Sequence, residues 1–472
     1  VLIPALDQTI TSVALPTIVS ELGGQNAYSW IGAAYLLAFS TIYGRLSDII
    51  GRKPVYFIAM TFFMVGSALG GAAQSFLWLA IARGIQGAGG GGLIQLSMIT
   101  IADITPLEKR GFYIGLVGTT WGVASVTGPI VGGALTDHAS WRWCFWMNLP
   151  AGGILSLILL FLLKLKPVPR RPFGQVVRQF DFIGLSLVIS GVACFLVGLE
   201  VGQDHWSSAA AIALICIGVV LIMGCCLHGL FTERIPVLPS RLFCTMTPAA
   251  VLICAFIHGM AVFTGSYYIP LYFQVLGSSA TIAGIKTMAF SLTSSVSGAL
   301  AGIISVKAGY RLVLWVSWAL IAVGYGLMIR LDSSTSIPLQ IVYIFIAGVG
   351  VGGVFQIPLI ALHASMPVSD IAMSTSAFML LRLLGSAVGV SVGEAIFVTE
   401  VKKRISAITN YSVGDSNTLT DNLTGLHNIQ PISTRNEVLH AYSRSLSVIW
   451  YVLTPIVTVG FLLCKFLVSF SE

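Results

Sequence analysis

Charged side chains are scarce in this chain. Of its 472 residues, 9% are Asp, Glu, Lys or Arg, whereas 56% are hydrophobic. Soluble globular domains carry about 25% charged residues. So few charges cannot cover the surface of a protein in water, whereas a bilayer requires apolar surface across a core of about 30 Å. The composition therefore predicts an integral membrane protein.

Several features that would indicate other functions are also missing. The formal net charge is +7, but the basic residues are not clustered, which argues against nucleic-acid binding. Most of the eight cysteines lie inside apolar stretches and do not predict a disulfide framework. No phosphate-binding loop, metal-ligand spacing or Ser/His/Asp arrangement is recognisable in the sequence. We therefore expect neither an enzyme nor a bound cofactor or metal.

Apolar stretches long enough to cross a bilayer as helices recur along the chain. The first series lies near residues 1–20, 27–45, 54–73, 76–100, 111–134, 149–165 and 182–200. The second series lies near residues 209–231, 247–273, 281–305, 310–329, 338–362, 371–398 and 446–469. These fourteen stretches predict an all-α, multi-pass membrane protein. The chain begins at Val1 inside an apolar stretch, which suggests that a longer native N-terminus precedes it.

The positions of Lys and Arg predict the orientation, because short outside loops disfavour them. If the N-terminus is cytoplasmic, fourteen basic residues fall in cytoplasmic segments, and short outside loops hold only Arg142 and Arg330. Both termini are then cytoplasmic and the polar segment 399–445 lies outside. That segment contains two acceptor sequons for glycosylation, at Asn410 and Asn422.

An internal repeat is the next signal, since many transporters consist of two related halves. Glycines and one glutamine recur at an offset of 261: Gly91, Gly92, Gln95, Gly128 and Gly132 correspond to Gly352, Gly353, Gln356, Gly389 and Gly393. Gly44 and Gly51 likewise correspond to Gly302 and Gly309 at an offset of 258. We expect a six-helix bundle over 1–165, a basic loop with two inserted helices over 166–240, and a second six-helix bundle over 241–472.

A short loop after the second stretch contains Gly44, Asp48, Gly51, Arg52 and Lys53. The glycines permit a tight turn, and Asp48 can pair with a basic group or cap a neighbouring helix. Such a contact would form a cytoplasmic gate that breaks when the halves move. The alternative is an ordinary cytoplasmic loop with positive charges.

Arg83 lies well inside the fourth stretch. A guanidinium near the bilayer centre costs about 2.5–3.5 kcal/mol on insertion scales, so it should face a polar cavity or a carboxylate. The alternative is an arginine that extends from a helix end towards the interface.

Gly128, Pro129, Gly132 and Gly133 lie in the fifth stretch. Gly128 and Gly132 are four residues apart and share one helix face, while Pro129 removes a backbone hydrogen bond and bends the helix. The alternative is a packing face of small residues with no further role.

Asp7 lies in the first stretch, and an acid within a membrane helix suggests a functional site. The alternative is an aspartate at the membrane interface. Other buried polar candidates are the repeat-related Gln95 and Gln356, and Glu394 in the thirteenth stretch. Arg382 and Lys286 are equally compatible with a functional role and with extension to the interface.

The motifs around Gly44, Arg83, Gly128 and Asp7, together with the fourteen predicted helices, resemble the fourteen-helix drug:proton antiporter branch of the major facilitator superfamily. Short segments such as Trp141-Arg142-Trp143 resemble its fungal members. The resemblance implies two bundles that rock about a central site and exchange protons for a small-molecule substrate. It implies that Asp7 couples protons with Arg83 as its electrostatic partner, that Gln95, Gln356 and Glu394 contribute to the substrate cavity, and that residues 128–133 form the antiporter signature. We expect a monomer in a lipid bilayer.

Three classes of function remain open at this stage. The first is proton-coupled export of drugs or toxic amphipathic metabolites. The second is vacuolar uptake of basic amino acids, which similar fungal proteins perform. The third is a receptor or membrane enzyme, which is disfavoured because a receptor needs no duplicated halves and an enzyme needs a reactive constellation. The first two differ in location, which is the plasma membrane or the vacuolar membrane.

Overall fold

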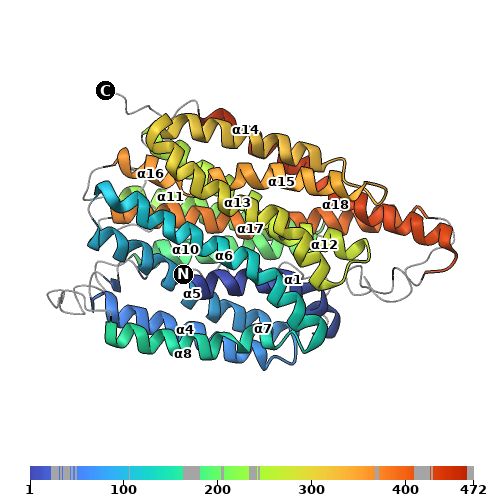
Figure 1. The fold of residues 1–472 in the computed structure, drawn as a ribbon, viewed down its shortest axis with the longest axis horizontal. Coiled ribbons are helices and arrows are strands. Elements are labelled where there is room, and N and C mark those ends of the chain that lie inside the picture. Colours follow the sequence, from blue (N-terminus) through green and yellow to red (C-terminus); the bar gives the residue numbers. More distant parts are fainter. Residues whose placement is uncertain are drawn as a thin grey trace.

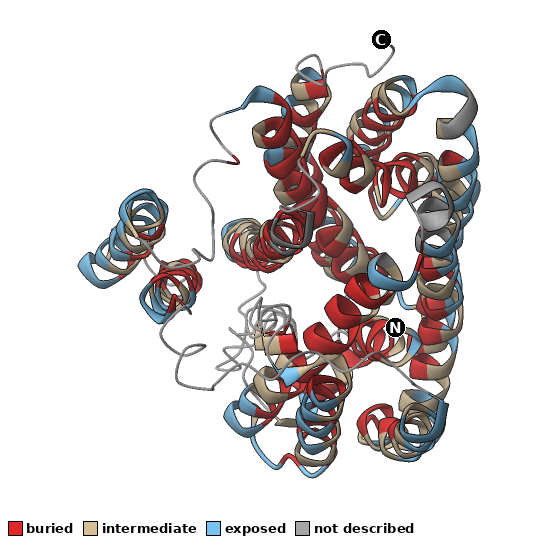
Figure 2. Cartoon of the chain, turned by 90° about the vertical axis from the view of Figure 1, so that its left-hand side faces the viewer, coloured by how far each residue is buried: buried red, intermediate tan, exposed pale blue. Residues whose placement is uncertain are grey.

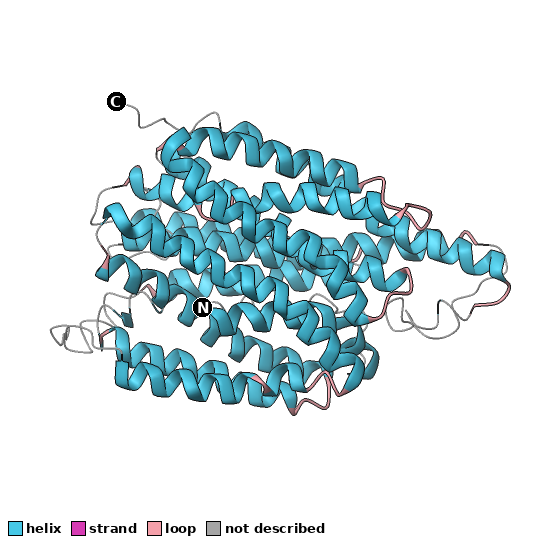
Figure 3. Ribbon diagram, viewed as in Figure 1, coloured by secondary structure: helices cyan, strands magenta, loops and turns pink. Residues whose placement is uncertain are grey.

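The computed structural model of the chain describes residues 1–22, 31, 34–35, 43, 46–47, 50–105, 107–162, 181–202, 207–232, 242, 245–366, 371–408, 426 and 429–464. Within these residues the regular elements are helices, and no strand occurs (Figure 3). In chain order they are α1 (Leu2–Leu22), α4 (Arg52–Gly71), α5 (Phe76–Ile104), α6 (Leu107–His138), α7 (Trp143–Trp146), α8 (Asn148–Leu162), α10 (Phe182–Gly202), α11 (Ala209–Phe231), α12 (Met246–Val275), α13 (Ala280–Ala308), α14 (Tyr310–Met328), α15 (Ile337–Gly353), α16 (Ile357–Ala364), α17 (Ile371–Ile405) and α18 (Ile432–Leu463).

The helices run roughly side by side, as Figure 1 shows, and the all-α fold predicted from the composition is confirmed. Eleven segments of the described residues are long and apolar enough to cross a membrane, and each coincides with a predicted stretch. α5 and α6, with 29 and 32 residues, lie alongside them. The predicted stretch near 27–45 falls mostly outside the described residues, so the number of fourteen stays a prediction.

Helix packing repeats between the two halves of the chain. α1 packs on α6 and α4 packs on α5, while α12 packs on α17 and α14 packs on α15. Gly51 and Gly309, which the sequence pairs, both have positive φ, of 95° and 79°, and each immediately precedes a helix. A side chain would strain the backbone at these φ values, which explains glycine at both positions.

α10 and α11 pack mainly on each other, and α10 also contacts α17. Seen from one end of the molecule, this pair stands at the left edge of Figure 2, apart from the other helices. Large apolar side chains of α11 are exposed, among them Val220 at 65% and Met223 at 59%. Such surface suits contact with lipid.

Two predicted segments differ from the structure. The stretch 338–362 is divided between α15, which ends at Gly353, and α16, in which the second residue, Pro358, has no backbone N–H to continue a helix from α15. The outside segment 399–445 is partly helical: α17 continues to Ile405, with an ion pair between Arg404 Nη2 and Glu400 at 3.0 Å, and α18 begins at Ile432. Asn410 and Asn422 lie outside the described residues.

Candidate functional site

Asp7 and Arg83 form an ion pair inside the N-terminal half. Arg83 Nη1 donates to Asp7 Oδ2 at 2.6 Å, and neither side chain is exposed to solvent, at 0% each. Asp7 comes from α1 and Arg83 from α5, two helices whose remaining residues are almost entirely apolar or small. A charge buried without a partner would be strongly unfavourable here, and in this pair the two opposite charges neutralise each other.

Amide side chains complete the coordination of the Asp7 carboxylate. Gln86 Nε2 donates to Asp7 Oδ1 at 2.7 Å, and Asn148 Nδ2 of α8 donates to the same oxygen at 2.8 Å. Gln86 Oε1 accepts from Arg83 Nη1 at 2.7 Å. Ser67 of α4 accepts from both amides, at 2.7 Å from Gln86 and 3.3 Å from Asn148. The sequence motifs do not point to Gln86, Asn148 or Ser67. The one available signal is the spacing of three between Arg83 and Gln86, which places both on one helix face.

The guanidinium of Arg83 is held from its other sides as well. Arg83 Nε donates to the backbone oxygen of Ile31 at 3.3 Å, and Arg83 Cζ lies 4.3 Å from the ring centroid of Tyr35. The ring of Phe145 is 5.7 Å away. Stacking of a cation on an aromatic face is favourable, and more so in a dry environment. The ion pair therefore connects α1, α4, α5 and α8 at the centre of the first half.

A cavity lies between the two halves. Its open space, including the part open to solvent, is about 1540 Å³. One wall comes from α1, α5 and α6, and the other from α12, α13, α17 and the connection between α15 and α16. In the residues described, none from α10 or α11 belongs to this lining.

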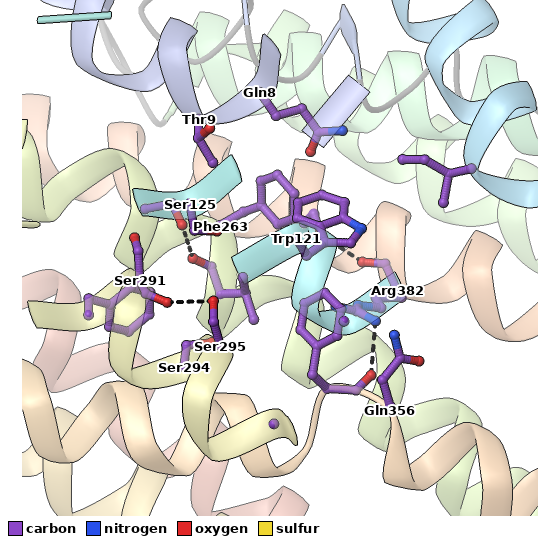
Figure 4. Close-up of a pocket in the computed structure, with 18 of the residues that line it drawn as sticks. Gln8, Thr9, Trp121, Ser125, Phe263, Ser291, Ser294, Ser295, Gln356 and Arg382 are labelled. Atoms are coloured by element: carbon purple, nitrogen blue, oxygen red, sulfur yellow. Dashed lines mark hydrogen bonds between the residues drawn. The ribbon is translucent and has the colours of Figure 1, made fainter. Parts of the chain in front are cut away.

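The lining combines aromatic rings with hydroxyl and amide groups. Figure 4 shows Trp121 of α6 and Arg382 of α17 on one side of the view and the serines of α13, Ser291, Ser294 and Ser295, on the other. Gln8, Thr9 and Ser12 on α1 also line the cavity. Asp7, the neighbour of Gln8, is not among the described lining residues, so the ion pair lies behind the cavity wall.

The break between α15 and α16 places two residues at the cavity. Phe355 and Gln356 lie in this connection and both belong to the lining. Arg382 Nη1 donates to the backbone oxygen of Phe355 at 3.1 Å, and Arg382 Cζ lies 3.8 Å from the Phe355 ring centroid. The rings of Phe355 and Trp121 are 5.8 Å apart. Interrupted helices at substrate cavities are common in membrane transporters.

Of the three residues predicted for the substrate cavity, Gln356 is at the cavity. Gln95 on α5 and Glu394 on α17 are each 2% exposed, and neither belongs to the described lining. Repeat-related Gln95 and Gln356 are thus placed differently, because the helix is interrupted in the second half and continuous in the first. Arg382, for which the sequence left both readings open, lies in the cavity wall.

The glycines of the fifth predicted stretch lie where α6 meets its neighbours. A Cβ on Gly128 would come within 2.0 Å of Thr9 Oγ1, and one on Gly132 within 2.9 Å of Ile10 O, both on α1. A Cβ on Gly133 would come within 2.6 Å of Thr281 Cα on α13, in the other half. Pro129 lines the cavity and contacts Gly284 of α13. The small residues therefore permit close packing both within the first half and between the halves.

The predicted cytoplasmic gate is described in part. Arg52 Nε donates to Asp103 Oδ2 at 3.0 Å, and Arg52 also donates to Ser47. Lys53 Nζ donates to the backbone oxygen of Leu160 at 2.7 Å. These contacts join α4 to α5 and α8 within the first half. Gly44 and Asp48 lie outside the described residues.

At the opposite end of the bundle, a contact bridges the two halves. Asp137 near the end of α6 accepts hydrogen bonds from the backbone N–H of Thr281, at 3.0 Å, and from its hydroxyl group. A carboxylate at the start of α13 is favoured by the positive end of that helix. The halves are therefore closed together at the end that the distribution of Lys and Arg predicts to be outside.

The two similar halves, the apolar outer surface and the central cavity define this protein as a membrane transporter. The chain belongs to the Major Facilitator Superfamily, which it matches over residues 1–390. It is 37% identical to the efflux pump dotC of Dothistroma septosporum, covering 100% of this chain and 83% of the relative. It is 33% identical to the efflux pump FUS6 of Gibberella fujikuroi, covering 99% and 87%. The family resemblance inferred from the motifs is confirmed, and these relatives are transporters rather than enzymes.

Solved structures confirm the fold. A bacterial homologue of the human lysosomal transporter Spinster, in an inward-facing and occupied conformation, has a TM-score of 0.61 at 14% identity, covering 98% of this chain and 93% of that one. The xylose transporter XylE from E. coli, in a partially occluded inward-open conformation, has a TM-score of 0.60 at 13% identity, covering 100% and 96%. The protein is thus a multi-pass membrane transporter that acts on a small molecule.

Proposed function

We propose that this chain is a proton-coupled antiporter that exports small amphipathic molecules from the cytoplasm by alternating access. The observation that carries the proposal is the buried ion pair between Asp7 and Arg83. Asp7 directly precedes Gln8, which lines the cavity. Fungal relatives named efflux pumps support the direction of transport. The cargo-binding region is the cavity between the halves.

Asp7 is the group that exchanges protons in this proposal. In the state described, the carboxylate is held by Arg83, Gln86 and Asn148, all of which donate to it. A proton on Asp7 removes its negative charge and leaves Arg83 without a counter-ion. Breaking a buried ion pair in this way costs about 3–5 kcal/mol, so protonation favours a rearranged packing of α1 against α5.

The rearrangement reaches the cavity through α1. Gln8, Thr9 and Ser12 are on the same helix as Asp7 and line the cavity, and Thr9 Oγ1 donates to Ala124 O of α6 at 2.9 Å. A small rotation of α1 therefore changes the cavity wall and the contact with α6 together. Because proton and cargo prefer different arrangements, inward proton flow drives outward cargo flow.

The remaining assignments belong to the same proposal. The helices α10 and α11 are an insert between two six-helix bundles. The cytoplasmic gate is formed by Gly44, Asp48, Gly51, Arg52 and Lys53. Residues 128–133 allow the bundles to slide. Gln95 and Glu394 act from behind the cavity wall. The protein functions as a monomer in the plasma membrane or the vacuolar membrane.

Reconstitution tests the proposal. The full chain in liposomes is given a pH gradient, and the accumulation of a test compound is followed with and without an ionophore that collapses the gradient. We expect accumulation that follows the gradient and reverses when the gradient is reversed. Transport that is indifferent to the gradient would show facilitated diffusion instead and would refute proton coupling.

Vacuolar uptake of basic amino acids is the second candidate. The cavity carries the positive charge of Arg382, which repels a cationic cargo and so favours the export proposal. Radiolabelled arginine uptake into vacuoles, together with imaging of a tagged copy, separates the two: arginine accumulation would favour the amino acid candidate.

A further inference from the structure

We propose that Arg382 is the binding site for an acidic group of the cargo, so that the transporter prefers anionic aromatic or amphipathic molecules to neutral ones. This inference rests on the proposed export function and names the class of cargo. Four observations carry it: the charge balance of the cavity, the free donors of Arg382, the aromatic rings next to it, and the hydroxyl groups that α13 contributes to the same cavity.

Arg382 is the charged side chain in the described lining of the cavity; no Asp or Glu of that lining balances it. The side chain is 7% exposed. Within the described part of the chain, no carboxylate lies within ion-pair distance of its guanidinium. This contrasts with Arg83, whose charge is neutralised by Asp7. A buried cation without a counter-ion is unfavourable, and a ligand that brings a negative charge removes this cost.

The guanidinium has donors to spare. An arginine carries five N–H donors in a planar fork that matches two oxygens of a carboxylate or related group. Among the described residues the guanidinium makes one hydrogen bond, from Nη1 to the backbone oxygen of Phe355 at 3.1 Å. The neighbouring His258 cannot serve as a counter-ion, because an imidazole is neutral or positively charged; its Nε2 lies 2.9 Å from the backbone oxygen of Val351. The remaining donors are available to a ligand in the cavity.

Aromatic rings adjoin the cation. Phe355 stacks against Arg382 at 3.8 Å and lies 5.8 Å from the ring of Trp121. Phe263 and Phe290 also line the cavity. The cavity also receives hydroxyl groups from Ser291, Ser294 and Ser295 of α13, which lie on the other side of the view in Figure 4. A flat apolar body with one acidic group at its end fits this arrangement, since the rings accept the body and Arg382 accepts the charge.

Equilibrium binding of two matched probes tests the inference. Naphthalene-2-sulfonate and naphthalene-2-sulfonamide share the ring system and differ in charge at neutral pH. Each is dialysed against the purified full chain in detergent, for the wild type, Arg382→Gln and Arg382→Lys. We expect Arg382→Gln to weaken sulfonate binding by about ten- to a hundredfold, the range for a hydrogen bond to a charged group. The sulfonamide should change by less than about threefold, and Arg382→Lys should restore part of the sulfonate affinity.

The sulfonamide also serves as the folding control. If the role of Arg382 is only to hold the connection between α15 and α16 through its hydrogen bond to Phe355, Arg382→Gln should weaken the binding of both probes by the same factor. Trp121→Ala is the comparison for lost ring contact, and it should weaken both probes by similar factors. Equal loss of both probes in Arg382→Gln, unchanged sulfonate binding in that variant, or no binding of the sulfonate by the wild type would each overturn the inference.

The binding assay needs no gradient, so its failure is separate from failure of the export proposal. Charge-selective binding without transport in liposomes would refute the antiport while the assignment of Arg382 stands. Gradient-driven transport with equal affinity for both probes would refute the assignment of Arg382 alone.

Discussion

Replacing Asp7 by asparagine removes a single negative charge from the centre of the first half. Asp7→Asn keeps the size of the side chain, and the new oxygen still accepts from Gln86 and Asn148, which lie 2.7 and 2.8 Å from Asp7 Oδ1. It loses the ion pair to Arg83 Nη1 at 2.6 Å. Because both charges are fully buried, Arg83 is left without a counter-ion, at a cost of about 3–5 kcal/mol.

That magnitude predicts two separate effects. The variant should insert into membranes and bind cargo but melt at a lower temperature than the wild type. It should also lose gradient-driven accumulation, because an asparagine cannot take up or release a proton. In the double variant Asp7→Asn, Arg83→Gln, the uncompensated charge is gone, so most of the lost stability should return. Coupling should not return, which separates the structural effect from the functional one.

The assay is accumulation of a test compound in proteoliposomes under an imposed pH gradient, with thermal unfolding in detergent measured in parallel. Asp181→Asn is the matched control, because Asp181 is also buried and has a basic neighbour, His228 Nε2 at 3.0 Å, but lies at the start of α10. This control should keep coupled transport. Accumulation by Asp7→Asn at the wild-type ratio would refute the role of Asp7 and direct attention to Glu394.

Three further predictions concern the other parts of the site. Asn148→Ala should lower the rate of coupled transport, because about 1.5–3 kcal/mol is lost with the hydrogen bond to Asp7. The measurement is accumulation in proteoliposomes under an imposed pH gradient, and an unchanged rate would exclude Asn148 from the coupling network. Gly133→Ala should slow transport of every cargo and destabilise the protein by about 1–3 kcal/mol, because its Cβ would meet Thr281 Cα. Gly153→Ala is the control and should be neutral, since a Cβ there meets open space. Similar melting temperatures of the two variants would refute the packing argument. Arg52→Gln should change the transport rates of all cargoes by one common factor of less than about fivefold. Its partner Asp103 is 48% exposed, and exposed ion pairs contribute about 0–1 kcal/mol. A change confined to one cargo would contradict a gating role.

Much of the fold follows from the sequence because membrane helices need apolar stretches of a defined length. The eleven qualifying segments coincide with predicted stretches, and Gly51 and Gly309 mark the same position in both halves. The division of 338–362 into α15 and α16 could not be predicted with equal ease. Pro358 is a local signal for a new helix, but the place of Phe355 in the connection also depends on its contact with Arg382, which is far away in the sequence.

The charged residues of the site can be predicted from the sequence, whereas its neutral polar residues cannot. Asp7 and Arg83 are conspicuous because ionised groups are rare in apolar stretches, and the structure places them together. Asn148 and Ser67 are common kinds of residue in membrane helices, so only the packing of α8 and α4 against α1 and α5 gives them a role. The sequence likewise could not distinguish an arginine at the interface from Arg382 in the cavity wall, because depth within a helix does not determine which face it occupies.

The most direct test of proton-coupled export is transport by the reconstituted chain under an imposed pH gradient. The test compounds are naphthalene-2-sulfonate, its neutral sulfonamide and radiolabelled arginine, each followed with the gradient in both directions and after its collapse. Our proposal predicts that at least one naphthalene compound is concentrated on the acidic side, that its movement reverses with the gradient, and that arginine is not concentrated. Concentration of arginine alone, or equilibration of every compound without regard to the gradient, would contradict it.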